Sequence, residues 1–301
     1  MIYTVTFNPA IDYVMRVGTM IPGGVNRADS EEMYFGGKGI NVSLVLSELG
    51  FKSKALGFAA GFTGQAIEQG ISERGVETDF VHLEQGCSRI NVKIKSPDQE
   101  TELNGQGPAI PDSALERLFS KLEALKDGDT LVLAGSIPNS LPSDIYERIL
   151  ARLAGKNIRC VVDATKELLL NVLKYKPFLI KPNDHELGEM FEVELKTDSE
   201  IIEYAKRLRG MGAVNVLVSM AGDGAVLVDE YGAVHKCGVC KGTVRNSVGA
   251  GDSMVAGFIA GCEKGYDYAL KLGTASGGAT AFSDGLAERD KIYELLKQLD
   301  Q

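Results

Sequence analysis

The chain has 301 residues, of which 44% are hydrophobic and 24% charged, the composition of a soluble globular enzyme. Its formal charge of −9 argues against nucleic acid or an anionic membrane surface as a partner, and no apolar run is long enough to span a bilayer. The five cysteines are scattered and odd in number, which is typical of free thiols in a reducing compartment. We therefore expect a cytoplasmic protein without a signal peptide.

The first third of the chain predicts strands and helices that are punctuated by glycines. We expect strands at 2–7, 13–17, 26–35 and 54–58, helices within 36–50 and 64–74, and a hairpin of 89–95 with 100–103. The strands within 11–35 and 89–103 are more polar than the others and do not fit a buried sheet. They predict a separate small antiparallel sheet that is inserted twice into the main domain and covers an active site or a partner.

From residue 111 onward, apolar strands alternate regularly with helices. We expect strands at 130–135, 158–163, 178–183, 214–220 and 224–229, helices at 112–125, 142–153, 166–173 and 200–209, and a largely helical last third. Near-continuous apolar strands that alternate with helices indicate a parallel sheet covered by helices on both faces. The predicted fold class is therefore α/β.

The stretch NSVGAGDSM, residues 246–254, places small residues before an aspartate at the start of an apolar helix. A buried helix that begins at Gly249, Ala250 and Gly251 presents free backbone N–H groups, which form an anion site. Asp252 has two possible roles there. It is either a carboxylate that complements the helix dipole, or a general base that takes a proton from a substrate hydroxyl while the amides stabilise a transferred phosphoryl group.

The stretch FGGKGINV, residues 35–42, is a second glycine-fronted helix start. It is neither a P-loop nor a GxGxxG motif, which argues against a dinucleotide-binding oxidoreductase. The glycines, Gly37 among them, allow backbone to approach a ligand, Lys38 supplies a point charge for a phosphate, and Asn41 offers an amide to sugar hydroxyls. The alternative is a tight turn with Asn41 as a buried polar residue.

The segments GGKGINVSLVLSELG and NSVGAGDSMVAGF resemble the two signatures of the ribokinase/PfkB carbohydrate-kinase family. The resemblance extends to TFNPAID, RINVKIK, NGQGP, LAGSIP, KPNDHE and VSMAGDGA, and so covers essentially the whole chain. It implies a ribokinase-like three-layer α/β/α sandwich with a mainly parallel sheet and a small antiparallel β lid. The main domain would comprise 1–10, 36–86 and 107–301, and the lid 11–35 and 87–106.

The resemblance assigns roles to individual residues. Asp252 matches the catalytic base, and Gly249, Ala250 and Gly251 match the anion hole. The substrate-binding positions are matched by Asp12, Gly37, Lys38 and Asn41, and by Arg27 and Arg89, two basic residues of the lid strands that would bind an existing phosphate. A local basic pocket in an acidic protein agrees with that role, although both arginines could be solvated edge residues.

A nucleotide and a metal ion are also implied. Asn183 and Glu186 share a helix face at the spacing i, i+3, and the family uses this pair to position Mg²⁺, mostly through water. Ser219, Gly222 and Gly224 form a strand–turn–strand edge where backbone could meet ATP, unless this is a plain glycine hairpin. Gly278 and Ser283 would line the adenine pocket, with Ser283 standing where some relatives carry asparagine.

The expected activity is ATP-dependent phosphorylation of a sugar phosphate. Within the family the resemblance is strongest to enzymes that act on fructose 1-phosphate at its C6 hydroxyl, and tagatose 6-phosphate and fructose 6-phosphate are alternative substrates. A sensor of sugar phosphates without catalysis is the alternative of another class, and an intact base within an anion hole argues against it. The resemblance also implies a homodimer formed through the lid.

Overall fold

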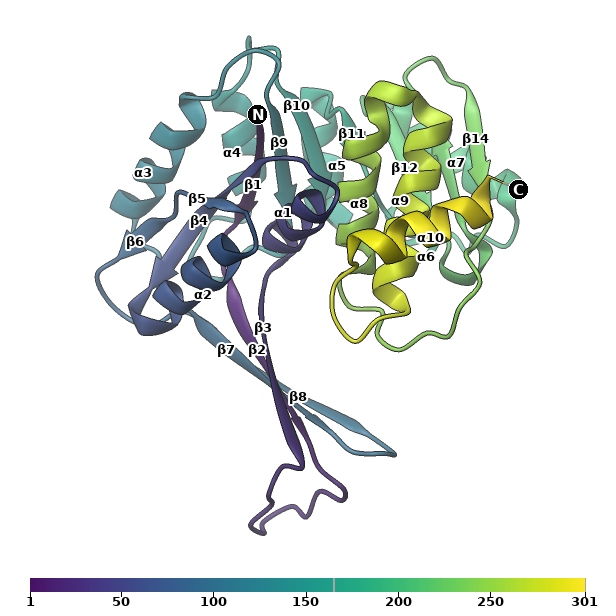
Figure 1. The fold of residues 1–301 in the computed structure, drawn as a ribbon. Coiled ribbons are helices and arrows are strands. Elements are labelled where there is room, and N and C mark those ends of the chain that lie inside the picture. The colour runs from purple at the N-terminus through teal and green to yellow at the C-terminus, as the bar shows by residue number, and fades with distance from the viewer. Residues whose placement is uncertain (165, 301) are drawn as a thin grey trace.

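The computed structural model describes residues 1–164 and 166–300, and these residues form two separate sheets (Figure 1). The strands of the main sheet are β1 (Ile2–Thr6), β4 (Ser53–Ala60), β5 (Glu77–Thr78), β6 (Val81–Leu83), β9 (Thr130–Ala134), β10 (Arg159–Asp163), β11 (Leu179–Ile180), β12 (Asn215–Ser219), β13 (Ala225–Val228) and β14 (Val234–Cys237). Their order is β14-β13-β12-β11-β10-β9-β1-β4, and both β5 and β6 pair with β4. All neighbouring pairs from β12 to β4 are parallel, whereas the pairs β12–β13 and β13–β14 are antiparallel. The expected mainly parallel sheet is thus confirmed.

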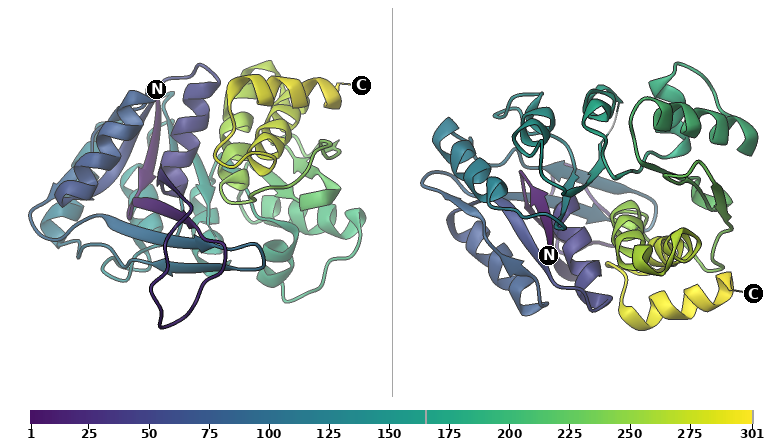
Figure 2. Two further views of the ribbon diagram at one scale, coloured as in Figure 1. Left: turned by 60° about the horizontal axis from the view of Figure 1, so that its bottom comes forward. Right: turned by 90° about the horizontal axis from the view of Figure 1, so that it is seen from above.

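Helices cover both faces of the main sheet, which gives the three layers visible from above in Figure 2. One layer contains α3 (Asp112–Glu123), α4 (Ile145–Arg152), α5 (Lys166–Val172), α6 (Asp184–Met190) and α7 (Asp198–Gly210). The other contains α1 (Lys38–Glu48), α2 (Gly61–Glu73), α8 (Ala250–Gly261), α9 (Tyr266–Ala281) and α10 (Arg289–Leu299). None of the helices within the described residues is long and apolar enough to cross a membrane.

The strand β9 explains why the central strands are apolar throughout. Leu131 and Leu133 pack into the core beneath one helical layer, whereas Val132 and Ala134 pack into the core beneath the other. All of them are buried because side chains alternate across a strand and both faces of this sheet are covered. The polar residues that follow such a strand are therefore the first ones that can reach solvent or a ligand.

Helix α8 is fixed against α9 by close backbone approach. A Cβ on Gly257 would lie 2.5 Å from the Leu272 carbonyl oxygen, and one on Gly261 would lie 2.7 Å from the Ala269 Cα. Only glycine allows the two helices to come this close at these positions. These contacts fix the second half of α8 against α9.

The second sheet projects from the main domain and consists of β3 (Ser30–Gly36), β2 (Ala10–Arg16), β7 (Arg89–Lys95) and β8 (Glu100–Asn104), in that order (Figure 1). Its outer pairs are antiparallel as expected, whereas the middle pair β2–β7 is parallel. The middle pair is parallel because β2 and β7 both lead away from the main sheet and β3 and β8 return to it. The predicted separate small sheet is thus confirmed.

The strand expected at 26–35 begins only at Ser30. The side chain of Asn26 accepts a hydrogen bond from the backbone N–H of Ile21 at 2.8 Å and donates one to the Ile21 carbonyl at 3.0 Å. These bonds close the loop 21–26, and Arg27, which follows the loop, is exposed and outside any strand. The prediction that Arg27 lies on a strand is therefore wrong, because the asparagine side chain replaces the strand pairing at this point.

The two faces of the second sheet differ in chemistry. The register places Tyr13 beside Met33 and Val92 on one face, and Asp12 beside Tyr34 and Asn91 on the other. The first face is apolar and open, with Met33 53%, Ile90 41% and Leu103 63% exposed. The second face is polar and carries Asp12, Arg89, Asn91 and Lys93.

Candidate active site

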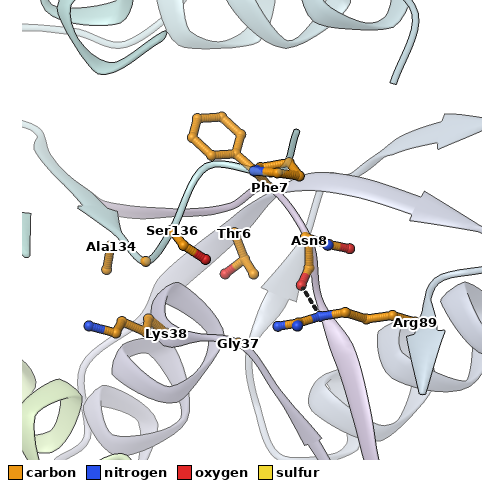
Figure 3. A pocket seen from close by; sticks show the side chains of 10 residues that line it. Thr6, Phe7, Asn8, Gly37, Lys38, Arg89, Ala134 and Ser136 are labelled. Carbon is orange, nitrogen blue, oxygen red and sulfur yellow. Dashed lines mark hydrogen bonds between the residues drawn. The ribbon is translucent and has the colours of Figure 1, made fainter. Parts of the chain in front are cut away.

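A pocket of about 210 Å³ lies between the carboxyl ends of β1 and β9, the start of α1 and the start of β7. It is lined by Thr6, Phe7, Asn8, Gly37, Lys38, Arg89, Ala134, Gly135, Ser136 and Pro138 (Figure 3). In the main sheet, β1 lies between β4 on one side and β9 on the other, so the strand order reverses here. Ligands of open parallel sheets bind at the carboxyl ends of the strands at such a point.

Two cations reach this pocket from different elements. Figure 3 shows the Arg89 guanidinium and the Lys38 side chain on opposite sides, with Thr6 and Ser136 between them. Arg89 donates from Nε to the Asn8 carbonyl at 3.0 Å, and this hydrogen bond fixes its side chain. The other guanidinium N–H groups can then donate to a ligand in the pocket. The arrangement suits an anion such as a phosphate. Arg27, which was expected to join them, is not among the lining residues.

A buried ion-pair network lies next to the pocket. Asp163, at the end of β10, is paired with Lys38 at 3.3 Å and with Lys181 at 3.4 Å. Burial acts to raise the pKa of Asp163, but the Lys181 and Lys38 ammonium groups outweigh it, and the pKa is lowered. Asp163 is therefore a carboxylate whose charge is balanced within the protein.

Asp252 is the second buried carboxylate, 4% exposed, and its surroundings are different. Its Oδ2 accepts a hydrogen bond from Asn41 Nδ2 at 2.8 Å. Burial and the nearby Asp163 charge raise the pKa of Asp252 to about 6, against opposing effects of Asn41, Lys38 and Lys181. A carboxylate with a pKa close to neutrality suits proton transfer, and such perturbed groups gather at functional sites.

The start of α8 has no side-chain cap within the described residues, and of its first amides the Ala250 N–H donates to the Ser247 carbonyl at 3.2 Å. Gly249, the N-cap, has a left-handed φ of 80°. A Cβ on Gly251 would lie 3.1 Å from Lys181 Nζ, so this ammonium group lies directly against the first turn. Free amides and a cation at one helix end form an anion site.

Asp12 connects the second sheet to this centre. Its Oδ1 accepts a hydrogen bond from Asn91 Nδ2 at 2.7 Å. A Cβ on Gly36 would lie 3.5 Å from both Asp12 Oδ2 and Asn41 Oδ1, so the three residues meet at the base of the second sheet. The structure therefore brings together Asp12, Asn41 and Asp252, three residues to which the resemblance assigned roles.

The Asn183–Glu186 pair forms a reciprocal capping box at the start of α6. Asn183 Oδ1 accepts from the Glu186 N–H at 2.7 Å, and Glu186 Oε2 accepts from the Asn183 N–H at 2.9 Å. Asn183 also bridges to Ser219 at the end of β12. The pair lies near the charged centre, since the Glu186 charge contributes to raising the pKa of Lys38.

The predicted nucleotide residues fall in two places. Gly222 lies in the turn Ala221–Asp223, and a Cβ there would meet no atom within 4 Å. Gly224 has a φ of 88°, and a Cβ there would lie 2.1 Å from the Cys237 carbonyl oxygen. Gly222 is therefore open to a ligand, whereas the close backbone packing at Gly224 requires glycine whether or not a ligand is bound.

Gly278 and Ser283 lie on and just after α9. A Cβ on Gly278 would lie 3.3 Å from the Cys240 Cβ. Ser283 donates from its hydroxyl to the Ala279 carbonyl at 2.8 Å. This internal hydrogen bond occupies the hydroxyl proton of Ser283, while its oxygen can still accept.

Comparison with protein-family models matches residues 5–291 to the pfkB family of carbohydrate kinases. The chain belongs to this family. It is 48% identical over 301 residues to the 1-phosphofructokinase of Bacillus subtilis (strain 168), across 99% of this chain and 98% of the relative. It is 37% identical over 302 residues to the D-tagatose-1-phosphate kinase of Bacillus licheniformis, with 99% and 98% covered. Phosphofructokinase-2 from Escherichia coli, solved in complex with substrates and products, superposes with a TM-score of 0.93 at 25% identity, across 100% of this chain and 99% of that one.

Membership in the pfkB family confirms the resemblance that the two glycine-rich signatures indicated. The chain is a sugar kinase, and the family implies ATP as the phosphoryl donor together with a divalent metal ion. The full-length matches to named sugar-phosphate kinases agree with a pocket that presents Arg89 and Lys38.

Sequence reasoning did not single out three residues that contact the predicted site residues or lie beside them, namely Asp163, Lys181 and Asn91. Asp163 is the last residue of an apolar parallel strand, and Lys181 follows another. A polar residue at the carboxyl end of such a strand was a signal that could have identified both. Asn91 lies within a strand that reads as ordinary alternation, and the sequence alone offers no signal for it.

Proposed function

We propose that the protein transfers the γ-phosphoryl group of ATP to the C6 hydroxyl of fructose 1-phosphate, which gives fructose 1,6-bisphosphate and ADP. The observation that carries this proposal is the buried Asp252 carboxylate at the uncapped start of α8, with a pKa of about 6. Asp252 takes the proton of the C6 hydroxyl as the oxygen attacks the phosphorus, and the bond from phosphorus to the bridging oxygen of ADP breaks.

The amides of Gly249, Ala250 and Gly251 are proposed to stabilise the charge on the transferred phosphoryl group. These three residues are half-buried, and the buried part of α8 begins with Asp252, so the amides lie at the mouth of the site where a phosphoryl group can reach them. Lys181, which lies against Gly251, adds a positive charge on the same side. Asn41 orients the base through its hydrogen bond to Asp252 Oδ2.

The pocket between Arg89 and Lys38 is proposed to bind the phosphate that the sugar already carries. Gly37 brings the backbone to the pocket, and Asp12 faces the sugar hydroxyls from the second sheet. The names of two relatives, a 1-phosphofructokinase and a D-tagatose-1-phosphate kinase, support a substrate with its phosphate on C1. Arg27 does not line this pocket in the single chain. Its proposed role in substrate binding therefore requires its loop to reach the substrate from elsewhere.

The main alternative substrates are other ketose phosphates. Tagatose differs from fructose only in configuration at C4, so one pocket could accept the 1-phosphates of both. Tagatose 6-phosphate and fructose 6-phosphate carry the phosphate at the other end, which would place a different hydroxyl at Asp252. The higher identity to the 1-phosphofructokinase favours fructose 1-phosphate.

Magnesium is the proposed metal, and the residues present fit it. Mg²⁺ prefers carboxylate oxygens and retains waters, and one or two carboxylates together with nucleotide phosphates suffice to hold it. Glu186 uses Oε2 within the capping box, and Oε1 is the oxygen that would face the metal or its water. When bound, the ion would neutralise phosphate charge during transfer.

ATP itself is proposed to bind beside this metal site. Asn183, Ser219, Gly222 and Gly224 would line its phosphates and ribose. Gly278 and Ser283 would line the adenine, with Ser283 accepting rather than donating a hydrogen bond.

A coupled assay of ADP release tests the proposal. Fructose 1-phosphate, tagatose 1-phosphate, fructose 6-phosphate, tagatose 6-phosphate and fructose are compared with ATP and Mg²⁺ present. We expect the highest kcat/KM with fructose 1-phosphate and a loss of at least tenfold in Arg89→Ala, while Arg148→Ala on α4 serves as the matched control. Binding of a sugar phosphate without ADP release would instead identify a sensor.

We also propose that two copies associate through the apolar face of the second sheet. This face leaves Met33, Ile90 and Leu103 exposed in the single chain, and a face of this kind marks an interaction site. Sedimentation velocity should find a dimer that Met33→Asp with Leu103→Asp converts to monomer. Met211→Asp, at a methionine 48% exposed on the main domain, is the control that should leave the dimer intact.

A further inference from the structure

Asn91, in the middle of the polar face of the second sheet, has one buried side-chain atom without a partner. The residue is 6% exposed, and among the described residues no group forms a hydrogen bond with its Oδ1. Three other buried side-chain atoms share this property, on Ser53, Arg209 and Thr274, and these lie on β4, α7 and α9 of the main domain. A buried carbonyl oxygen without a hydrogen bond costs free energy, so we expect this atom to have a partner that a bound ligand supplies.

The neighbouring hydrogen bond fixes which atom of the amide is unpaired. Asn91 lies beside Asp12 in the β2–β7 register, and its Nδ2 is 2.7 Å from Asp12 Oδ1. An ionised carboxylate can only accept, so the NH₂ group must face Asp12 and the carbonyl oxygen must face elsewhere. The missing partner of Asn91 is therefore a hydrogen-bond donor.

The position of Asn91 indicates which donor this is. Arg89, two residues earlier on the same face of β7, lines the phosphate pocket. Asp12, the partner of Asn91, lies with Gly36 and Asn41 at the base of the second sheet, and Asn41 in turn contacts Asp252. Asn91 is thus two residues from the group that would bind the sugar's phosphate, and it is linked through Asp12 and Asn41 to the group that would receive the C6 proton.

We infer that Asn91 Oδ1 accepts a hydrogen bond from a secondary hydroxyl of the ketose, on C3 or C4, and so acts as a specificity-determining residue. The inference rests on the proposed function, because it assumes a ketose phosphate that spans from Arg89 to Asp252. Its Nδ2 holds Asp12 in place while its Oδ1 reads the sugar. A sugar that lacks the hydroxyl leaves the buried oxygen unpaired and is rejected for that reason.

The same geometry recurs at a second asparagine of the site. Asn91 and Asn41 each direct an amide N–H to a carboxylate, to Asp12 and Asp252 respectively. Each asparagine therefore turns its carbonyl oxygen away from that carboxylate. A ligand with several hydroxyl donors matches such a surface, and a ligand without them does not.

The test compares fructose 1-phosphate with its 3-deoxy and 4-deoxy analogues in the wild type, Asn91→Ala and Asn104→Ala. Asn104 lies beside Asn91 on β8 and is exposed, so its variant controls for changes to the strand. We expect one analogue to lose tenfold or more in kcat/KM with the wild type and with Asn104→Ala, but less than threefold with Asn91→Ala. An equal loss with all three proteins would overturn the inference.

Two further measurements keep the outcome decisive. If Asn91→Ala does not fold, the similarly sized Asn91→Leu fills the same space without an acceptor, so it should also lose less than threefold with the deoxy analogue, at a lower overall rate. Full sensitivity to the deoxy analogue in Asn91→Leu would count against the inference. If the wild type phosphorylates no ketose phosphate, the proposed function fails, whereas turnover of fructose 1-phosphate with equal losses refutes only the role of Asn91.

Discussion

Helices α6 and α8 both carry acidic residues in the first turn, yet their N-termini differ in how the backbone N–H groups are capped. At α6, the side chains of Asn183 and Glu186 satisfy each other's backbone N–H groups in a closed capping box. At α8, Gly249 turns the chain without any side-chain cap, and Asp252 bonds to Asn41 on another helix. A closed start stabilises its own helix, whereas an open start keeps its amides and its carboxylate available for a ligand.

The largest expected effect comes from Asp252→Asn, which removes the acid from the open start. Loss of a general base should lower kcat by about a thousandfold or more, because this role contributes typically ~10²–10⁴-fold and the site is otherwise built around it. Turnover of ATP with fructose 1-phosphate measures the loss. Activity within tenfold of the wild type would assign Asp252 to the helix dipole instead.

Stability provides an independent readout of the same variant. Because folding raises the pKa of Asp252 to about 6, the carboxyl group stabilises the fold at low pH and loses this contribution as the pH rises through about 6. At pH 8 the buried carboxylate therefore opposes folding, and Asp252→Asn should gain about 1–3 kcal/mol and raise the Tm. A carboxylate that only complemented the dipole would predict a loss of about 0.3–1 kcal/mol.

The next largest effect is expected for Asp163→Asn, which changes the charge beside the open start. Lys181, only 7% exposed along its side chain, would lose its partner, and breaking a buried pair costs about 3–5 kcal/mol. The variant also removes a charge that raises the pKa of Asp252, so the pH dependence of activity should move to lower pH. Thermal unfolding and a pH profile measure the two effects.

Asp129→Asn is the matched control for this variant. Asp129 is a buried carboxylate that pairs with the Met1 amino group at 2.9 Å, and it does not contribute to the Asp252 pKa. It should lower stability and leave the pH profile in place. A shift of equal size in both variants would mean that general destabilisation, rather than local charge, sets the profile.

How far the sequence predicts this molecule depends on whether a feature is local. The open start of α8 is written in consecutive small residues, and the layers follow from the apolar strands that alternate with helices. The Asp163–Lys181 pair joins residues from two strand ends that only the sheet order brings together. The prediction that Arg27 lies on a strand is wrong because the side chain of Asn26 replaces backbone pairing at this point. The partnerless oxygen of Asn91 depends on the burial of a side chain, which periodicity does not give.

The pH dependence of activity is expected to be smaller but direct. With Asp252 as base, kcat/KM should fall about tenfold per pH unit below pH 6, as the carboxyl group becomes protonated. The phosphate of the sugar also titrates near pH 6, so the Kd of fructose 1-phosphate should be measured by calorimetry over the same range. If the change in Kd accounted for the whole fall in kcat/KM, the titration of Asp252 would not determine the pH dependence of activity.

The smallest expected effect separates capping from metal binding at the closed start of α6. Glutamine can replace glutamate in a capping box, so Glu186→Gln should keep stability within about 0.5 kcal/mol. If Glu186 also faces magnesium, the same change should raise the Mg²⁺ concentration for half-maximal rate severalfold. Helix α7 offers the control, because Thr197 and Glu200 form the same box there. Glu200→Gln should alter neither the stability nor the Mg²⁺ concentration for half-maximal rate. Equal metal dependence in both variants would mean that Glu186 caps the helix and does not contact the metal.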